Sequence, residues 1–418
     1  MLFINNKIVF LQKILFMDLI SRKYYADKVD SWLGKGQIIV LVGQRRIGKS
    51  FVLKDFMLRH EVETDTNIIY IDKEKKDFDF IKNYTDLNDY IDKNYAKGKH
   101  NFILIDEIQD IEEWERSVRS YRSEDNTDII ITGSNARMLS SDLSTLLSGR
   151  CQEIHVHGLS YSEFLTFHEL EDNDDSLKKY LNYGGLPGLR QIGIDNEEHV
   201  HDYLQGVLNT VVLKDIIERH NIRNVAFLNK LLQYLADNTG KPTSANNISN
   251  YMKNIGTTVS TNVVVDYSSY FEEAYLVKCV QRYDIHGKKI LETNGKYYFE
   301  DIGIRNLLSG LNRREKDIEK VLENVVYQHL TQLDFDVRIG QLQAGEVDFV
   351  CTKNDIKVYV QVCYLIATEE TTEREFGTLS KINDNYPKYV ISLSPLVTRS
   401  NHDGIIHLGL REFLKNGL

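Results

Sequence analysis

The sequence predicts an α/β protein, with a parallel sheet flanked by helices in its N-terminal half and an α+β module at its C-terminal end. Short β-branched runs alternate with longer helical patterns over the first third of the chain. A glycine-rich loop joins the first of these runs to a helix, and the last quarter contains a helix followed by strand-like runs. At 418 residues, the chain is long enough for two or three domains that each bury a core.

The first strand-like run, Ile38–Val42, leads into a Gly-x-x-x-x-Gly-Lys-Ser loop, and a helical pattern continues to Leu58. Glycine at both ends of the loop permits positive φ and close approach to a phosphate, and the N–H groups at a helix N-terminus carry partial positive charge. A glycine-rich surface turn is the alternative interpretation. The pattern predicts a binding site for ATP and Mg²⁺ made of Gly43, Gln44, Arg45, Arg46, Ile47, Gly48, Lys49, Ser50 and Phe51.

Within this loop, Lys49 is expected to reach the β- and γ-phosphates and so to take part in catalysis. Ser50 is expected to bind Mg²⁺ through its hydroxyl. Arg45 and Arg46 occupy variable positions of the loop, so we assign them to packing or to the surface rather than to catalysis.

A second strand-like run, Asn67–Asp72, is followed by a polar helical stretch, and the next run, Phe102–Ile105, ends in Asp106 and Glu107. Ligands of open α/β sheets bind at the carboxyl ends of the strands. We therefore expect Asp106 to hold Mg²⁺ through water and Glu107 to polarise the attacking water. A strand that merely ends in two acids at a solvated turn is the alternative.

Polar residues also follow the fourth strand-like run, Asp128–Thr132. Asn135 or Ser134 could hydrogen-bond the γ-phosphate or the attacking water as a sensor, and an N-cap role for either residue is equally compatible with this position. Arg150, which precedes another β-type stretch, could stabilise the transition state of phosphoryl transfer in its own site or in that of a neighbouring chain. A structural ion pair is the alternative for Arg150.

Five motifs follow one another in a specific order: the phosphate loop, Leu-Ile-Asp-Glu-Ile-Gln from Leu104, Thr-Gly-Ser-Asn from Thr132, Leu-Ser-Gly-Arg from Leu147, and Leu-Ser-Tyr-Ser-Glu-Phe-Leu from Leu159. This order resembles the AAA-type ATPases of bacteria and archaea that carry a C-terminal domain of unknown function. The Gly-Gly-x-Pro element from Gly184 also matches that family. The resemblance implies a P-loop NTPase sheet, ATP binding and hydrolysis, and a helical lid between about Ser176 and Arg219.

The middle of the chain predicts three helices and a hairpin, an arrangement that resembles a winged helix. The helices are expected over Val225–Leu235, from Ser244 to Ile255 and over Ser260–Ala274, and the hairpin strands over Tyr275–Tyr283 and Lys289–Phe299. The third helix, at the position of a recognition helix, contains neither Lys nor Arg, which is unusual for a base-reading helix. This domain could therefore contact either DNA or a protein. If it binds DNA, the phosphate contacts would come from the hairpin cations Lys278, Arg282, Lys288, Lys289 and Lys296.

The last quarter resembles the restriction-endonuclease-like fold, with a helix over Ile318–Leu330 followed by strands. The metal site of that fold uses a helix Glu, a strand Asp and a Glu-x-Lys on the next strand. Glu323 and Asp348 fit the first two positions, but Gln361 and Cys363 stand at the other two. A neutral amide is a weak ligand for Mg²⁺, and a thiol cannot replace a cationic lysine. We therefore expect this fold without nuclease activity, serving as a binding platform or as packing for the winged helix.

Composition excludes some functional classes. The chain is 42% hydrophobic and 27% charged, and no apolar run approaches the roughly 18 residues of a membrane span. A net charge of −10 gives no general attraction to nucleic acid. Four separated cysteines and twelve histidines form no metal-ligand pattern, so we expect reduced, buried thiols in a cytoplasmic protein without zinc. Lys13 interrupts the apolar N-terminus, which favours a disordered or mis-annotated extension over a signal peptide.

Together these observations predict an N-terminal extension (1–17), an AAA-type P-loop ATPase domain (18–170), a helical lid (171–222), a winged-helix-like domain (223–312) and a degenerate restriction-endonuclease-like domain (313–418). The predicted function is Mg²⁺-dependent ATP binding and hydrolysis coupled to the C-terminal modules. A nucleotide-gated regulator that binds DNA or protein with little turnover is the alternative, and an ATP-coupled nuclease is disfavoured by Gln361 and Cys363. A homo-oligomer or a protein partner is compatible with this sequence, and no membrane partner is expected.

Overall fold

The computed structural model describes residues 20–61, 64–135, 149–310, 317–343, 345–366, 368–394 and 397–418. The predicted N-terminal extension (1–17) lies outside these ranges. Contacts divide the chain into two units, one made of Met1–His157 with Glu273–Tyr275 and the other of Gly158–Glu272 with Leu276–Leu418. Among the described helices, none has the length and apolar character needed to cross a bilayer.

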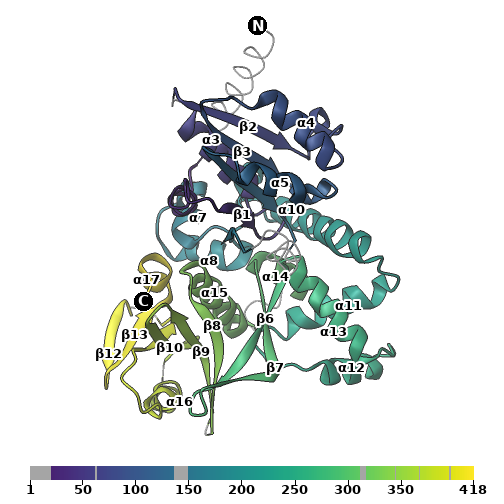
Figure 1. Cartoon of the computed structure of the whole chain (residues 1–418). Helices are drawn as coiled ribbons and strands as arrows, with labels where there is room; N and C mark the ends of the chain where they lie inside the picture. Colours follow the sequence, from purple (N-terminus) through teal and green to yellow (C-terminus); the bar gives the residue numbers. More distant parts are fainter. Residues whose placement is uncertain are drawn as a thin grey trace. The chain divides into compact units, whose positions relative to one another are not determined.

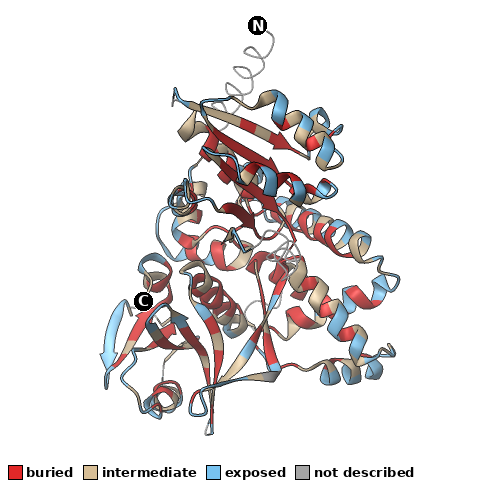
Figure 2. Ribbon diagram, in the orientation of Figure 1, coloured by how far each residue is buried: buried red, intermediate tan, exposed pale blue. Residues whose placement is uncertain are grey.

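The first unit contains the predicted parallel sheet, with the strand order β2-β3-β4-β1-β5 (Figure 1). All four pairings in this sheet are parallel. Figure 2 shows that the central strands β1, β3 and β4 are buried along most of their length, as expected for a parallel sheet whose faces are covered. The outer strands β2 and β5 are only partly buried. The strands are β1 (Ile38–Val42), β2 (Thr66–Asp72), β3 (His100–Asp106), β4 (Thr127–Gly133) and β5 (Cys151–His155).

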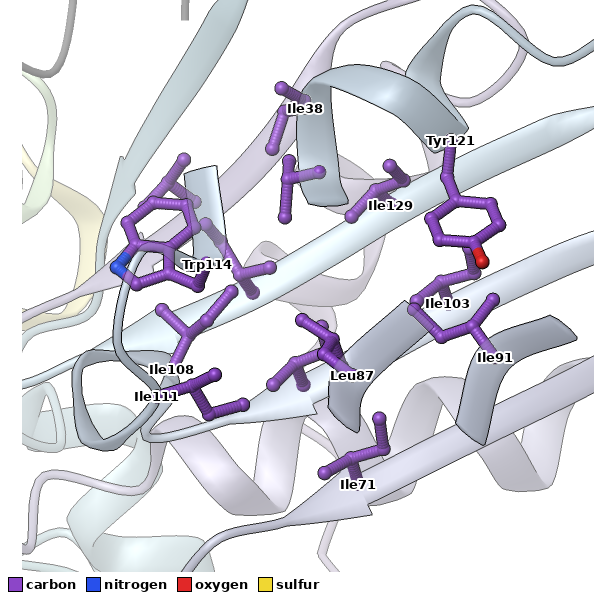
Figure 3. Packing of buried hydrophobic residues seen from close by; sticks show 14 of the residues in the cluster. Ile38, Ile71, Leu87, Ile91, Ile103, Ile108, Ile111, Trp114, Tyr121 and Ile129 are labelled. Carbon is purple, nitrogen blue, oxygen red and sulfur yellow. The ribbon is translucent and has the colours of Figure 1, made fainter. Parts of the chain in front are cut away.

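Four α-helices of the first unit are described, together with two short 3₁₀ turns at Lys76–Phe78 and Ile108–Asp110. Leu87 of α4 and Trp114 of α5 pack in one apolar cluster with strand residues such as Ile103 (Figure 3). Each such buried side chain contributes about 1.5–3 kcal/mol, so this cluster holds the strands that carry the site in register. The helices are α2 (Lys23–Asp30), α3 (Lys49–His60), α4 (Tyr84–Asn94) and α5 (Trp114–Arg122).

The second unit begins with helices, in agreement with the helical stretch predicted between Ser176 and Arg219. A π-helical segment, Val211–Glu218, continues α10. The three helices predicted after it are also present as α11, α12 and α13, and the side chain of Ser244 caps α12 as expected. The helices are α7 (Tyr161–His168), α8 (Asp174–Tyr183), α9 (Leu189–Ile192), α10 (Glu197–Thr210), α11 (Val225–Asp237), α12 (Ala245–Asn254), α13 (Thr261–Glu273), α14 (Ile302–Ser309), α15 (Ile318–Gln332), α16 (Glu369–Ser380) and α17 (Leu410–Asn416).

A mixed sheet of eight strands completes the second unit, in the order β12-β13-β11-β10-β9-β8-β6-β7. The predicted hairpin is present, and its strand β6 pairs in parallel with β8, with Arg282 opposite Ile339. The hairpin therefore belongs to the same sheet as the C-terminal strands. The strands are β6 (Val277–Asp284), β7 (Lys289–Phe299), β8 (Asp336–Leu342), β9 (Gly345–Lys353), β10 (Ile356–Cys363), β11 (Lys388–Ser392), β12 (Arg399–His402) and β13 (Ile405–Gly409).

The Gly-Gly-x-Pro element forms a close contact between the end of α8 and the start of α14. The carboxylate of Asp301 accepts hydrogen bonds from the N–H groups of Gly185, at 2.9 Å, and Ile304, at 3.0 Å. Gly184 has a φ of 77°, and a Cβ there would lie 2.5 Å from both carboxylate oxygens of Asp301. Only glycine fits this position without displacing Asp301.

All four cysteines are unpaired, as the sequence predicts. Cys351 and Cys363 are buried as expected, whereas Cys151 and Cys279 are only half-buried because each lies in a strand that is partly exposed.

Candidate functional site

The phosphate loop has the backbone conformation that its glycines allow. Gly43 has a φ of 138° and Gly48 a φ of 103°, and α3 begins directly after Gly48. The ammonium of Lys49 donates hydrogen bonds to the carbonyl oxygens of Gly43, at 2.9 Å, and Gln44, at 3.0 Å. Lys49 is buried, so its charge lies inside the loop, where a phosphate group would be bound.

Gly43 is also required by its neighbours in the fold. A Cβ at this position would lie 2.3 Å from the carbonyl oxygen of Val156, in the segment that follows β5. The N–H of Val156 donates to the carbonyl of Val42 at 2.7 Å, which fixes this close approach. Gly43 is therefore required by a close contact between two backbone segments, in addition to the approach of a phosphate that the sequence predicts.

The two predicted metal ligands lie together at the carboxyl edge of the sheet. The carboxylate of Asp106 accepts a hydrogen bond from the hydroxyl of Thr132 at 2.6 Å, and Ser50 lies near enough to affect its pKa. Burial raises the pKa of Asp106 to about 6, whereas the neighbouring hydroxyls of Thr132 and Ser50 oppose this rise. A hydroxyl and a carboxylate are oxygen ligands of the kind that Mg²⁺ prefers, so this pair fits that ion.

Glu107 lies beside this pair in a left-handed conformation, with a φ of 55°. Its N–H donates to the hydroxyl of Thr132 at 2.9 Å, and its carboxylate accepts from the hydroxyl of Ser134 at 3.3 Å and from the amide of Gln109. Thr132 thus orients both acids, a role that sequence reasoning missed. Such bonds restrict the rotamers of Glu107 and fix the direction of its carboxylate.

Asn135 is buried directly after Ser134, at the carboxyl end of β4. Because β4 lies between β1 and β3 in the sheet, this end is located between the phosphate loop and the two acids. The predicted sensor position is therefore near both parts of the site.

Arg150 does not join the site of its own chain. Its carbonyl accepts a hydrogen bond from the N–H of Ile38, the first residue of β1, at 3.0 Å. The phosphate loop follows the other end of this five-residue strand, about 16 Å away at roughly 3.3 Å per residue. The side chain of Arg150 is exposed, so the structure leaves it accessible from the opposite edge of the sheet.

Of the other loop residues, some are packed in the interior and some are exposed to solvent. Arg45 forms an ion pair with Glu74 at 3.4 Å, and Arg46 is exposed with a φ of 68°. Ile47 is buried, which suits a packing residue, while Phe51 in the first turn of α3 is 39% exposed. These positions agree with the noncatalytic roles predicted for Arg45 and Arg46.

Gln44 has a property that sequence patterns do not reveal. It is only 2% exposed, and neither its side-chain nitrogen nor its side-chain oxygen has a hydrogen-bond partner among the described residues. A buried amide without partners costs about 1–3 kcal/mol. A ligand at the phosphate loop could satisfy these atoms, so Gln44 fits a loop that binds a polar group.

Sequence reasoning also missed Asp72 and Arg22. Asp72 ends β2 opposite Asp106 in the register and forms an ion pair with Lys75 at 3.2 Å. Arg22 donates hydrogen bonds to the carbonyl oxygens of Ile47, at 3.4 Å, and His157, at 2.8 Å. The acid at the end of a β-branched run was a usable signal for Asp72, whereas nothing in the local sequence marks Arg22.

In the second unit, Glu323 of α15 and Asp348 of β9 come together, as their predicted positions require. The ammonium of Lys296 lies 3.0 Å from a Glu323 oxygen and 3.9 Å from an Asp348 oxygen. The suggestion that Lys296 neutralises phosphates from the hairpin surface is wrong, because this side chain is buried in an ion-pair cluster. Gln361 accepts a hydrogen bond from the N–H of Asp348 at 3.3 Å, and Cys363 is buried.

Comparisons with known proteins agree with this geometry. A family model described as an AAA domain matches residues 35–165, and a model described as a domain of unknown function matches residues 174–315. An uncharacterized protein of Haemophilus influenzae is 33% identical over 382 residues, which span 90% of this chain and 93% of that protein. An uncharacterized protein of Methanocaldococcus jannaschii is 28% identical over 397 residues, with 90% and 86% covered.

Among solved structures, the Walker-type ATPase of Pyrococcus abyssi is similar, with 15% identity and a TM-score of 0.48. The likeness covers 70% of this chain and 96% of that chain. The family assignment rests on three findings: the family model that matches the first unit, the relative that matches almost the full chain, and the parallel sheet with its phosphate loop. The chain belongs to the family of AAA-type P-loop ATPases that carry a separate C-terminal domain of unknown function.

Proposed function

We propose that the chain binds ATP with Mg²⁺ at residues 43–51 and hydrolyses its terminal phosphoanhydride bond. The observation that carries this proposal is that Ser50, next to the buried Lys49 whose ammonium is bound inside the loop, lies beside Asp106. It unites a phosphate-binding cation and two oxygen ligands at one edge of the sheet, where nucleotide ligands bind in α/β proteins.

Each residue has a separate role in this proposal. Lys49 releases its loop carbonyls and contacts the β- and γ-phosphates, while the N–H groups of the loop bind phosphate oxygens. Ser50 and Asp106 would hold Mg²⁺, which neutralises developing phosphate charge when bound. Glu107 accepts the proton of the attacking water, since its carboxylate is already oriented by Ser134.

Asn135 serves as the sensor of the γ-phosphate, because the end of β4 lies between the loop and the acids. Arg150 acts on the site of a neighbouring chain, since it lies at the other end of β1 from its own loop. Burial and the nearby charge of Arg150 lower the pKa of Arg122, so two cations gather at this exposed edge. An anionic partner surface would relieve their repulsion, which supports assembly of several chains around shared sites.

The C-terminal part would respond to the nucleotide state of the first unit. We assign the helical lid to 171–222, a winged-helix-like domain to 223–312 and a restriction-endonuclease-like domain to 313–418, all inside a cytoplasmic protein. Nuclease activity is not expected, because Gln361 and Cys363 replace an acid and a lysine. DNA or a protein remains a candidate partner for these modules.

A second candidate function is a nucleotide-gated regulator of DNA or protein binding with little turnover. The observation that favours it concerns Glu107, whose carboxylate is engaged by both Ser134 and Gln109. Both bonds are made to the same carboxylate oxygen and fix the direction of the carboxylate, so a partner that redirects it toward the water would control turnover.

Measurement of ATP binding and hydrolysis by Lys49→Ala tests the main proposal, with the exposed Lys93→Ala as its matched control. We expect Lys49→Ala to lose ATP binding and turnover, while Lys93→Ala retains both. Unchanged binding and turnover in Lys49→Ala would contradict the proposal. Wild-type protein that binds ATP with turnover below detection, and whose affinity for DNA or protein changes with nucleotide, would favour the regulator instead.

A further inference from the structure

A single buried lysine lies among three carboxylates in the second unit. The ammonium of Lys296 is 2.7 Å from an oxygen of Glu346, 3.0 Å from one of Glu323 and 3.9 Å from one of Asp348. Lys296 is 3% exposed. The first two distances match those of charge-assisted hydrogen bonds between an ammonium and a carboxylate.

Three elements that are distant in the sequence build this cluster. Lys296 comes from β7, Glu323 from α15, and Glu346 and Asp348 from β9, where spacing by two residues places both side chains on one face of the strand. None of these contacts follows from one local motif. The cluster exists because the hairpin and the C-terminal strands form one sheet.

Neighbouring groups close the cluster around its carboxylates. The hydroxyl of Tyr298 donates to Glu323 at 2.5 Å, and the N–H of Val362 donates to Asp348 at 2.8 Å. Gly240 has a φ of 73°, and a Cβ there would lie 2.8 Å from a Glu323 oxygen. These contacts orient two of the acids toward Lys296 and leave little room for another group beside Glu323.

Three converging carboxylates are the ligands of a hard divalent cation, and their mutual repulsion requires a positive charge among them. Isolated buried charges are strongly unfavourable, so buried acids occur with cations or keep their protons. Here the positive charge comes from the chain itself. The ammonium lies within 4 Å of all three acids, between the groups that a shared cation would join.

The electrostatics of the cluster agree with this geometry. Burial alone would lower the pKa of Lys296, but the three carboxylates more than offset this effect and raise it. Burial and the charge of Glu323 raise the pKa of Asp348 well above its usual value.

We propose that the ammonium of Lys296 is the resident cation of this cluster and takes the place of a divalent metal ion. The three acids are then held together without metal, and a divalent ion can enter only if the ammonium leaves. This assignment goes beyond ATP hydrolysis and does not depend on it. It also gives a structural reason for a metal-independent C-terminal module, in addition to the substitutions at Gln361 and Cys363.

The test uses Mn²⁺ as a probe and the full chain without nucleotide, with free Mn²⁺ measured by electron paramagnetic resonance. We expect wild type and Asp348→Asn to bind equal amounts of Mn²⁺, because the cluster excludes the ion. Lys296→Met should bind one additional Mn²⁺ per chain, and Lys296→Met combined with Asp348→Asn should lose it. Lys289→Met removes an exposed lysine from the same strand and should match wild type.

Two results would overturn the proposal. If wild type binds a Mn²⁺ that Asp348→Asn does not bind, or cleaves DNA with Mn²⁺ in a way that Asp348→Asn abolishes, Lys296 accompanies a metal rather than replacing one. If folded Lys296→Met gains no Mn²⁺, the ammonium does not occupy a cation position. Should Lys296→Met fail to fold, Lys296→Gln replaces it, and the comparison of wild type with Asp348→Asn decides the question without either variant.

Discussion

Ser50 lies beside Asp106, near enough to lower its pKa, although the two residues are 56 positions apart in the sequence. Ser50 lies in the first turn of α3, and Asp106 ends β3, on the far side of β4 from β1. The two residues therefore meet across the carboxyl edge of the sheet, which brings the phosphate loop and the acids together.

Asp106→Asn should separate nucleotide binding from turnover. The amide can still accept from Thr132, but it loses the charge that would hold Mg²⁺. We expect the steady-state ATPase rate to fall roughly 100-fold, or about 2.7 kcal/mol in activation free energy. Measurement of the rate over a Mg²⁺ titration checks this. A full rate at the Mg²⁺ concentration that saturates wild type would exclude Asp106 from the metal site.

Glu107→Gln should keep ATP binding and lose hydrolysis. A positioned general base contributes about 10²–10⁴-fold to a rate, so turnover should fall at least 100-fold. The dissociation constant of ATP should stay within about two-fold, because Glu107 does not contact the loop carbonyls that Lys49 occupies. Equal losses in binding and turnover would instead assign Glu107 to the support of the loop.

Arg150→Ala should impair ATP hydrolysis, and mixing this variant with the Glu107→Gln variant should restore part of the activity. An arginine supplied from a neighbouring chain contributes up to about 10³–10⁵-fold to phosphoryl transfer. Each variant alone should be nearly inactive. In a mixture, sites that combine an intact Glu107 with a neighbour's intact Arg150 should recover part of the wild-type rate. Full activity of Arg150→Ala, or the absence of recovery on mixing, would rule out a shared site.

Gly184→Ala should destabilise the second unit. The methyl group would meet the Asp301 carboxylate at 2.5 Å, and the φ of 77° is unfavourable for alanine. We expect a loss of roughly 2–4 kcal/mol in unfolding free energy by chemical denaturation. Gly206→Ala is the matched control, since a Cβ there meets no atom within 4 Å, and it should stabilise α10 by about 0.5–1 kcal/mol. Equal effects of both changes would mean that Gly184 is not restrained by Asp301.

The phosphate loop and the Asp106–Glu107 pair could be predicted because each is a contiguous pattern with a fixed position on a parallel sheet. Asp72 follows the same logic at the end of β2, but only the strand order places it beside Asp106. The position of Arg150 could also be predicted from the sequence, because a residue directly before a parallel strand must lie at the edge of the sheet opposite to the phosphate loop.

Other parts of the molecule depend on contacts between distant segments. Arg22, directly before α2, supports the loop, and Thr132 in β4 forms hydrogen bonds with both acids, but neither residue belongs to a pattern with the residues it contacts. Lys296 reaches Asp348 only because β6 pairs with β8. Hydrophobic periodicity predicts that these strands exist, but it does not predict their order in a mixed sheet.

The hydrogen bonds of Arg22 have a practical consequence for any shortened form of this protein. A chain that starts at Asp18 keeps the guanidinium that joins Ile47 to His157, whereas one that starts at Tyr24 loses both of these hydrogen bonds. The shorter chain should have weakened nucleotide affinity even though every residue of the phosphate-binding motif is intact. The minimal functional domain thus begins upstream of α2, the first described helix, at a residue that motif boundaries alone would discard.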